Sequence, residues 1–236
     1  MSKGGADLSL YEGLVSTRAI RRYTDEPVPD EVLRDILFAA TRAPSGSNRQ
    51  PFRFIVLTAG PVATEAKRLI GAGARQFWQD KRAADGYDRG SGAQDDSPKS
   101  RLARTMQRYV DTYESVPVVI LPCFVHYRHS TYTDGASVYP ACQNLLLAAR
   151  ALGYGGVITN WQFAADAELR ALLKIPDDAD IMATITLGRP EGHHGPVRRR
   201  PLPELVYGEH WGESPAWAVD PPGTGHTAAG PPSAST

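Results

Sequence analysis

Three groups of basic or polar residues, far apart in the chain, have side chains suited to binding an anion. They are Arg18, Arg21 and Arg22, the polar stretch 45–50, and the arginines at 198–200. A guanidinium fork matches the geometry of a phosphate group, so arginine clusters that converge on one site predict a phosphorylated ligand. Any one cluster, taken alone, is better explained as solvated surface charge, and the prediction therefore depends on their convergence.

The segment 155–161 has residues that could hold a flat ring. Gly155 and Gly156 leave room for a close approach to the backbone, and Asn160 and Trp161 follow shortly after. Trp161 could cover such a ring with its own indole. A core tryptophan at the end of a strand explains this residue equally well, so both interpretations stay open.

Several familiar catalytic and metal-binding patterns are missing or occur in the wrong context. The glycines of 71–73 and 153–156 lack the full spacing of a dinucleotide fingerprint, and no GxxxxGK phosphate loop occurs. Cys123, His126 and His129 have the spacing of metal ligands but lack a fourth ligand, so we expect no metal site. No strand–serine–helix elbow is found, and no Asp/His or Cys/His set predicts a catalytic side chain.

The candidate residues must be positioned by helices that alternate with strands. Hydrophobic periodicity predicts helices from residue 9, over 31–42, 62–78, 99–114, 136–152 and 166–173, and strands over 52–58, 116–125, 155–160 and 181–188. Such alternation is typical of a layered α/β or α+β domain. A chain that begins with two helices is a poor match to a doubly wound nucleotide-binding fold, which usually begins with a strand.

The length of 236 residues predicts one large domain, or one domain with appendages. We place that domain at 1–219. Within it, residues 84–100 lose all periodicity and are rich in glycine and aspartate, which predicts a mobile lid or insertion. Residues 220–236 consist mostly of Pro, Gly, Ser, Thr and Ala, and we expect this tail to be disordered because it has too little apolar surface to bury.

Charge and composition argue against several classes of partner. Lys+Arg and Asp+Glu both number 26, and this zero net charge predicts neither nucleic acid nor an anionic membrane as partner. No apolar run approaches the roughly 20 residues of a membrane span, and no signal region follows the first methionine. Two cysteines do not make a disulfide framework, so we expect a reducing, cytoplasmic location.

Eight segments, in order, resemble the nitroreductase family of FMN-dependent oxidoreductases. They are 17–23 (TRAIRRY), 27–29 (PVP), 43–54 (APSGSNRQPFRF), 143–149 (QNLLLAA), 152–153 (LG), 155–161 (GGVITNW), 187–190 (LGRP) and 198–202 (RRRPL). The resemblance extends from about residue 12 to 206. It implies an α+β fold, a three-layer α/β/α sandwich with a mostly antiparallel mixed sheet. It also implies an intertwined homodimer with two FMN sites at its interface.

The resemblance also implies which residues bind the cofactor: Arg18, Ala19, Arg21, Arg22, Pro44, Ser45, Gly46, Asn48, Ile158, Thr159, Asn160, Trp161, Arg198 and Arg200. The early arginines would hold the FMN phosphate and the ring edge, with Arg21 and Arg200 meeting at the phosphate. The loop 44–48 would come from the partner subunit, and 158–161 would lie against the isoalloxazine.

This chain departs from the family pattern at several positions. Many members have arginine and serine where this chain has Thr17 and Ala19, and Phe52 replaces a common tryptophan. Residues 84–100 match no family segment, in a region that often shapes the substrate pocket.

The implied activity is hydride transfer from NAD(P)H, through FMN, to a nitroaromatic or quinone-like acceptor by a ping-pong mechanism. The flavin carries the chemistry, so no catalytic side chain is expected. The implied partners are a second copy of the chain and a small-molecule substrate. Two alternatives remain: a flavin-fragmenting or substrate-dehydrogenating enzyme of the same fold, and a non-catalytic FMN-binding or sequestering protein.

Overall fold

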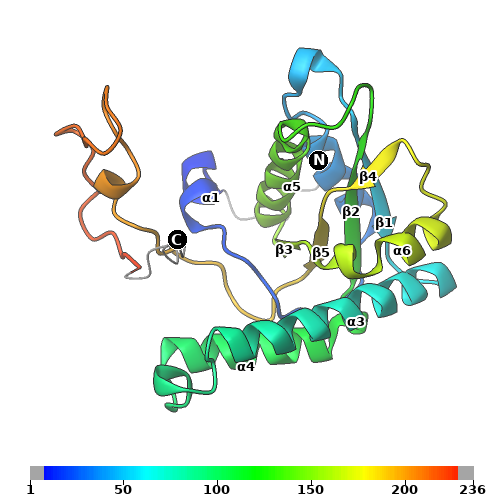
Figure 1. The fold of residues 1–236 in the computed structure, drawn as a ribbon, viewed down its shortest axis with the longest axis horizontal. Coiled ribbons are helices and arrows are strands. Elements are labelled where there is room, and N and C mark those ends of the chain that lie inside the picture. Colours follow the sequence, from blue (N-terminus) through cyan, green and yellow to red (C-terminus); the bar gives the residue numbers. More distant parts are fainter. Residues whose placement is uncertain (1–7, 228–236) are drawn as a thin grey trace.

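Five strands form a sheet with helices on both of its faces (Figure 1). The computed structural model describes residues 8–227. The helices are α1 (Leu10–Ser16), α2 (Asp30–Ala40), α3 (Pro61–Ala84), α4 (Pro98–Asp111), α5 (Tyr139–Ala151) and α6 (Asp166–Leu173). The strands are β1 (Phe52–Leu57), β2 (Val118–Val125), β3 (Gly155–Thr159), β4 (Ala179–Ile181) and β5 (Thr184–Gly188).

The sheet has the order β1-β2-β5-β3, and β4 pairs with β2 beyond the end of β5. Each pairing between these five strands is antiparallel. The predicted α+β sandwich with a mostly antiparallel sheet is therefore confirmed.

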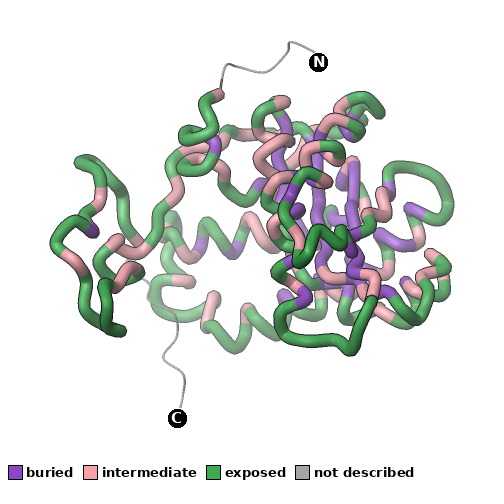
Figure 2. The backbone as a smooth tube through the Cα atoms, turned by 90° about the horizontal axis from the view of Figure 1, so that it is seen from above, coloured by how far each residue is buried: buried purple, intermediate pink, exposed green. Residues whose placement is uncertain are grey.

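Alternate residues of β2 face the two helical layers, because side chains of a strand point to opposite faces in turn. Val118 and Ile120 pack into the core beneath α2 and α5. Val119, Leu121 and Cys123 pack into the core shared with α3 and α4. Both faces are thus covered, as the nearly continuous apolar run of this strand predicts, and the buried residues gather on and around the sheet in Figure 2.

The stretch 181–188, predicted as one strand, is divided between β4 and β5. Both pair with β2, but the register shifts by one residue between the Cys123–Ile181 pair and the Ile120–Ile185 pair. Pro122 lies at this break, inside β2, where the sequence predicted a boundary. Its missing N–H cannot donate to the ladder, and only its carbonyl is used, by the N–H of Met182 at 2.8 Å.

Helices α3 and α4 form a long hairpin across one face of the sheet (Figure 1). α3 continues six residues beyond the predicted end at 78, with basic residues in its last turn that favour the C-terminal end of the helix dipole. The excursion predicted at 84–100 is the tip of this hairpin: it holds a turn at Gly86 (φ +63°), a short 3₁₀ helix over Gly90–Gly92 and the N-cap of α4, Ser97.

The C-terminal part of the chain leaves the sheet as an extended arm. Its start is held against the end of α1, where Gly195 N–H donates to Ser16 O and Val197 N–H to Val15 O. Of the tail predicted to be disordered, residues 220–227 are described, with a bridge between Arg199 and His226, and 228–236 lie outside the described residues. No helix in the described part of the chain is long and apolar enough to cross a lipid bilayer.

A buried lysine ties α3 to the strands. Lys67 is 6% exposed, and its ammonium donates to the carbonyl oxygens of Thr58 (2.7 Å), Val116 (2.8 Å) and Pro117 (3.2 Å). Burial lowers the pKa of this ammonium.

Lys67→Met should lower the free energy of unfolding by about 2–4 kcal/mol, because it removes a charged donor and leaves buried carbonyl groups without it. Urea unfolding measures the change. Lys99→Met is the control, since Lys99 donates to the single carbonyl of Asp85. Equal losses in the two variants would contradict this role for Lys67.

Candidate functional site

A cavity of about 610 Å³ opens between the α3–α4 hairpin and the segment that follows β3. We call it the aromatic cavity, because most of its wall is made of large apolar side chains: Phe77, Trp78, Tyr87, Leu102, Met106, Trp161 and Phe163. Arg21 and Lys81 are the charged residues of the wall. Lys81 is already paired with Asp85 at 2.5 Å. An apolar cavity with a few polar groups is typical of small-molecule sites.

A second, polar hollow of about 460 Å³ adjoins this cavity. Its wall includes Arg18, Arg22 and Arg101, together with Ala19 and His193. Arg21 and Leu102 line both the cavity and the hollow, so these two spaces adjoin each other. The arrangement suits a ligand with a flat aromatic part and an anionic part, since guanidinium groups bind phosphate or carboxylate with charge-assisted hydrogen bonds.

Arg21 stands at the junction of these two spaces without a partner. Its Nε is buried and makes no hydrogen bond, and no carboxylate in residues 8–227 forms an ion pair with it. A buried donor without an acceptor is costly, typically about 1–3 kcal/mol. An acceptor atom supplied by a ligand at this junction would remove that cost.

The sequence left open whether Trp161, in the segment 158–161, is a core residue or covers a flat ring, and in the structure it both packs in the core and lines the aromatic cavity. Trp161 is a core residue, 7% exposed and packed on Tyr109 and Tyr113 at ring distances of 5.2 and 5.7 Å, and it also lines the aromatic cavity. Thr159 and Asn160 line the cavity as well. Ile158, which is 37% exposed, does not.

The two glycines of β3 serve packing within the protein, which corrects the expectation that they make room for a ring. A Cβ at Gly155 would lie 2.6 Å from Ile20 Cγ1, and a Cβ at Gly156 would lie 2.5 Å from the carbonyl oxygen of Thr186. The Gly155 contact seats the basic segment 17–23 closely against β3, and the Gly156 contact lies between β3 and β5.

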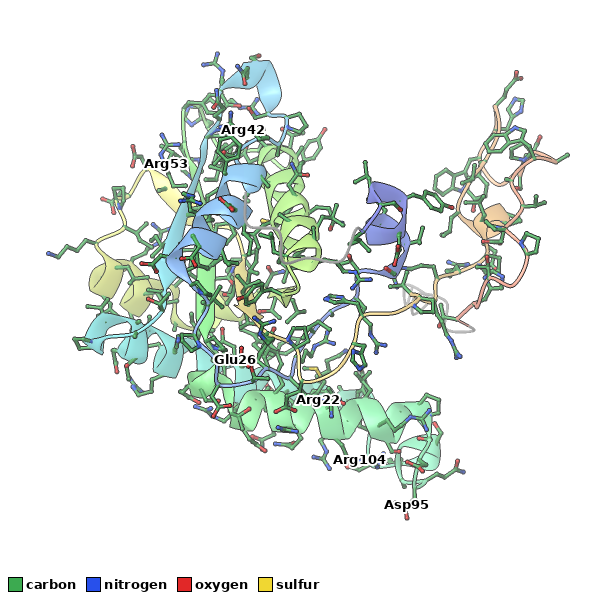
Figure 3. All side chains as sticks on the ribbon, turned by 180° about the vertical axis from the view of Figure 1, so that it is seen from behind. Arg22, Glu26, Arg42, Arg53, Asp95 and Arg104 are labelled. Carbon is green, nitrogen blue, oxygen red and sulfur yellow. The ribbon has the colours of Figure 1, made fainter. Side chains whose placement is uncertain are left out.

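The loop with Pro44, Ser45, Gly46 and Asn48 lies at the opposite end of the sheet from this site. In Figure 3, Arg42 at the end of α2 marks the neighbourhood of the loop, and Arg22 marks the basic segment near α4. Ser47, Asn48 and Gln50 all have positive φ values, of 51°, 51° and 50°. Strained backbone of this kind is concentrated at ligand sites and switch regions, so the loop is a candidate binding element although it lies apart from the cavity within one chain.

Arg198 and Arg200 lie on the C-terminal arm and line neither the aromatic cavity nor the polar hollow. Arg200 pairs with Glu204 at 2.7 Å. Because Val197 bonds to Val15, the arm passes the end of α1 just before these arginines. The structure thus brings together Arg18, Ala19, Arg21 and Arg22 with Thr159, Asn160 and Trp161, and leaves the other candidates outside.

Sequence reasoning missed the residues that α3 and α4 contribute to the site. Leu102 and Met106 lie in the helix predicted over 99–114, and in the structure they line the aromatic cavity. Arg101 and Thr105, the neighbours of these two, line the polar hollow. The sequence does contain one signal for these residues: α4 is mostly polar, with a single apolar stripe that includes Leu102 and Met106.

His194 fixes the backbone of the basic segment through its neutral imidazole. Its Nδ1 accepts from the N–H of Arg18 at 3.4 Å, so its Nε2 carries the proton and donates to the carbonyl of Tyr154 at 3.2 Å. Burial, with smaller effects of Arg150 and Arg18, lowers the pKa of this histidine. If Nδ1 became protonated, it could no longer accept the hydrogen bond from the N–H of Arg18.

The melting temperature should therefore fall as the pH drops below about 6.5. A base whose pKa is lowered by folding binds more protons when unfolded, so its stabilisation is complete above the unfolded pKa of about 6.5 and is lost as the pH falls through the folded value. Thermal melts between pH 8 and 5 test this, with His194→Gln as the non-titrating control. An identical pH dependence in both proteins would rule out His194 as the cause.

Several known proteins are similar to this chain in sequence and in fold. The model of the nitroreductase family matches residues 14–189. NADH dehydrogenase from Thermus thermophilus is 32% identical over 195 residues, which cover 80% of this chain and 90% of that protein. Iodotyrosine deiodinase from Nematostella vectensis is 24% identical over 216 residues, 87% of this chain and 76% of the relative.

Among solved structures, a nitroreductase-type protein from Desulfovibrio desulfuricans in complex with FMN is 29% identical. The alignment covers 87% of this chain and 99% of that chain, with a TM-score of 0.64.

Proposed function

Because this chain belongs to the nitroreductase family, we propose that it passes a hydride from NAD(P)H, by way of FMN, to a small organic acceptor of the nitroaromatic or quinone type. FMN supplies the two-electron redox chemistry when it is bound. The observation that carries the proposal is the meeting of the aromatic cavity and the polar hollow at the unpartnered Arg21. We expect the activity in the cytoplasm, where thiols such as Cys123 and Cys142 stay reduced.

The two spaces suggest how the chain would hold FMN. The aromatic cavity, with Thr159, Asn160 and Trp161 in its wall, suits the flat ring. The polar hollow, with Arg18 and Arg22, suits the phosphate. Arg21, which lines both spaces, would meet the edge of the ring. This assignment separates Arg21 from the phosphate, whereas the family resemblance puts both Arg21 and Arg200 there.

Ping-pong kinetics follow if donor and acceptor use the same cavity in turn. The wall residues are mostly apolar or aromatic, and such surfaces suit both a nicotinamide ring and a nitroaromatic or quinone ring. Neither substrate needs a protein acid or base placed at the cavity. Double-reciprocal plots should then be parallel.

Surfaces outside the cavity support a homodimer as the working form. Leu10 and Tyr11 of α1 are 74% and 68% exposed, and Phe38 of α2 is 63% exposed. Leu10 and Phe38 line the same apolar groove, which is bordered by α1, α2 and α5. Trp211 and Trp217 of the arm are also largely exposed. Apolar patches of this kind mark interfaces, and a second copy could cover them while its loop 44–48 completes the FMN site.

The absorption spectrum of the purified protein, before and after NADPH, tests the proposed function. We expect the flavin bands, release of FMN on denaturation, and bleaching by NADPH or NADH without oxygen. Added quinone should restore the bands. A colourless protein that cannot be reconstituted with FMN would refute the proposal, and bound FMN that neither nucleotide reduces would favour the FMN-sequestering alternative.

A further inference from the structure

Three hydroxyl groups behind the aromatic cavity join α4 and β5 to the basic segment. Thr186 Oγ1 lies 2.6 Å from Tyr109 Oη and 2.9 Å from Tyr23 Oη. Tyr23 Oη also lies 2.5 Å from the carbonyl oxygen of Ile20. We call Tyr23, Tyr109 and Thr186 the hydroxyl network.

The hydrogen bonds of this network run in one direction. The carbonyl of Ile20 can only accept, so Tyr23 donates to it. Tyr23 then accepts from Thr186, and Thr186 accepts from Tyr109. Burial raises the pKa of both tyrosines, and the nearby Arg21 lowers it by less, so both phenols stay protonated near neutral pH. The network is therefore a fixed neutral chain whose last bond is to the peptide between Ile20 and Arg21.

Two hydrogen bonds hold Ile20, the residue before Arg21. The N–H of Ile20 donates to the carbonyl of Gly156 at 3.0 Å, and its carbonyl accepts from Tyr23. The Ile20 side chain is buried against Gly155, where no Cβ would fit. Arg21 itself makes no ion pair in the described part of the chain. Its guanidinium is therefore placed by its backbone and by packing.

We propose that Tyr23, Tyr109 and Thr186 are positioning residues that hold Arg21 at the edge of the bound flavin ring. This inference rests on the proposed function, because it concerns the cofactor that Arg21 would meet. Tyr109 also packs on Trp161 at 5.2 Å, so the same residue supports the opposite side of the junction. The network thereby joins the two features of the site that would contact a flavin, one cation and one aromatic wall.

Tyr23→Phe and Tyr113→Phe form a matched pair of variants that tests this role. Both remove one buried phenolic hydroxyl, but the Tyr113 hydroxyl has no hydrogen-bond partner among the described residues. We expect Tyr23→Phe to raise the FMN dissociation constant about tenfold, the effect of losing one hydrogen bond in a fixed position. Tyr113→Phe should change it less than about twofold. Tyr109→Phe should give an intermediate effect, because Thr186 can still donate to Tyr23.

A double-mutant cycle shows whether Tyr23 acts through Arg21. In an Arg21→Ala background, Tyr23→Phe should change FMN affinity less than about twofold, since the group it positions is gone. The potential of the bound flavin gives a second measurement that general destabilisation would not move. Reduction adds negative charge to the ring, so a displaced Arg21 should lower the preference for reduced over oxidised FMN about fivefold, or ~20 mV for two electrons.

The outcomes separate the two proposals. Wild-type protein that binds no FMN would refute the proposed function itself. If the wild type binds FMN but Tyr23→Phe and Tyr113→Phe behave alike, or the effects of Tyr23→Phe and Arg21→Ala simply add, the positioning role is wrong and the proposed function stands. Equal flavin reduction potentials in wild type and Tyr23→Phe would also overturn the positioning role and leave the proposed function standing.

Discussion

Arg21→Ala should weaken FMN binding by roughly 10- to 150-fold. The guanidinium of Arg21 stands at the junction of the aromatic cavity and the polar hollow, and its buried Nε lacks an acceptor. A charge-assisted hydrogen bond contributes on the order of 1.5–3 kcal/mol. At about 1.4 kcal/mol per factor of ten, that range gives the stated loss. Flavin fluorescence titration measures the dissociation constants.

Riboflavin, which lacks the phosphate, shows which part of FMN Arg21 meets. If Arg21 meets the ring edge, riboflavin binding should weaken to a similar extent, whereas Arg18→Ala, at the proposed phosphate position, should weaken FMN binding alone. If Arg21 meets the phosphate, as the family resemblance implies, riboflavin binding should hardly change. Arg21→Lys should recover only part of the loss, because a point charge does not reproduce the guanidinium fork.

Arg104→Ala is the matched control for this experiment. Arg104 lies on α4, is more than half exposed and pairs with Asp96, and it lines neither space. Its removal should leave FMN affinity within about twofold of wild type. If Arg21→Ala is as harmless as Arg104→Ala, the cofactor does not contact Arg21 and the site assignment is wrong.

The fold could be predicted wherever local pattern and tertiary packing agree. β2 is an example: ten nearly continuous apolar residues predict a strand buried on both faces, and its alternate side chains do fill two cores. The division of 181–188 into β4 and β5 could not be predicted from that stretch, because its cause is Pro122 on a different strand. The end of α3 was also missed, because the six residues beyond the predicted end at 78 (QDKRAA) contain no large apolar side chain to continue the pattern.

The candidate site was predictable in its charged part and not in its apolar part. Arginines at 18, 21 and 22 stand out in the sequence because their chemistry is unusual in any context. Trp78 and Met106 do not, since an aromatic or apolar residue at helical spacing reads as core whether or not a cavity lies beside it. The role of the glycines at 155 and 156 was misjudged for a related reason. A glycine indicates that another group packs closely against the backbone, but the sequence does not show whether that group belongs to a ligand or, as here, to the protein itself.

The position of the loop 44–48 leads to the prediction with the most distinct outcome. Within one chain this loop lies at the opposite end of the sheet from the site (Figure 3), yet Ser47 and Asn48 within it, and Gln50 just after it, hold positive φ values. If a second copy brings its loop to the site, each FMN site contains Arg21 of one chain and Asn48 of the other. Asn48→Asp is the suitable variant, because aspartate also tolerates φ of +51° and places a negative charge beside the anionic cofactor.

Two heterodimers, made by co-expression with two affinity tags, then test this. They carry the same two substitutions, either on different chains or on the same chain. With Arg21→Ala on one chain and Asn48→Asp on the other, one site carries both changes and the second site is intact, so about one FMN per dimer should be bound. With both changes on one chain and a wild-type partner, each site carries one change, and almost no FMN should remain. A site built from one chain predicts the reverse: about one FMN for the second heterodimer and almost none for the first. FMN released per dimer is the measurement, and because both heterodimers contain the same two substitutions, a difference between them cannot arise from folding or from the total charge. Equal FMN content in the two would refute a shared site in this form, and the reversed order would assign Asn48 to the site of its own chain.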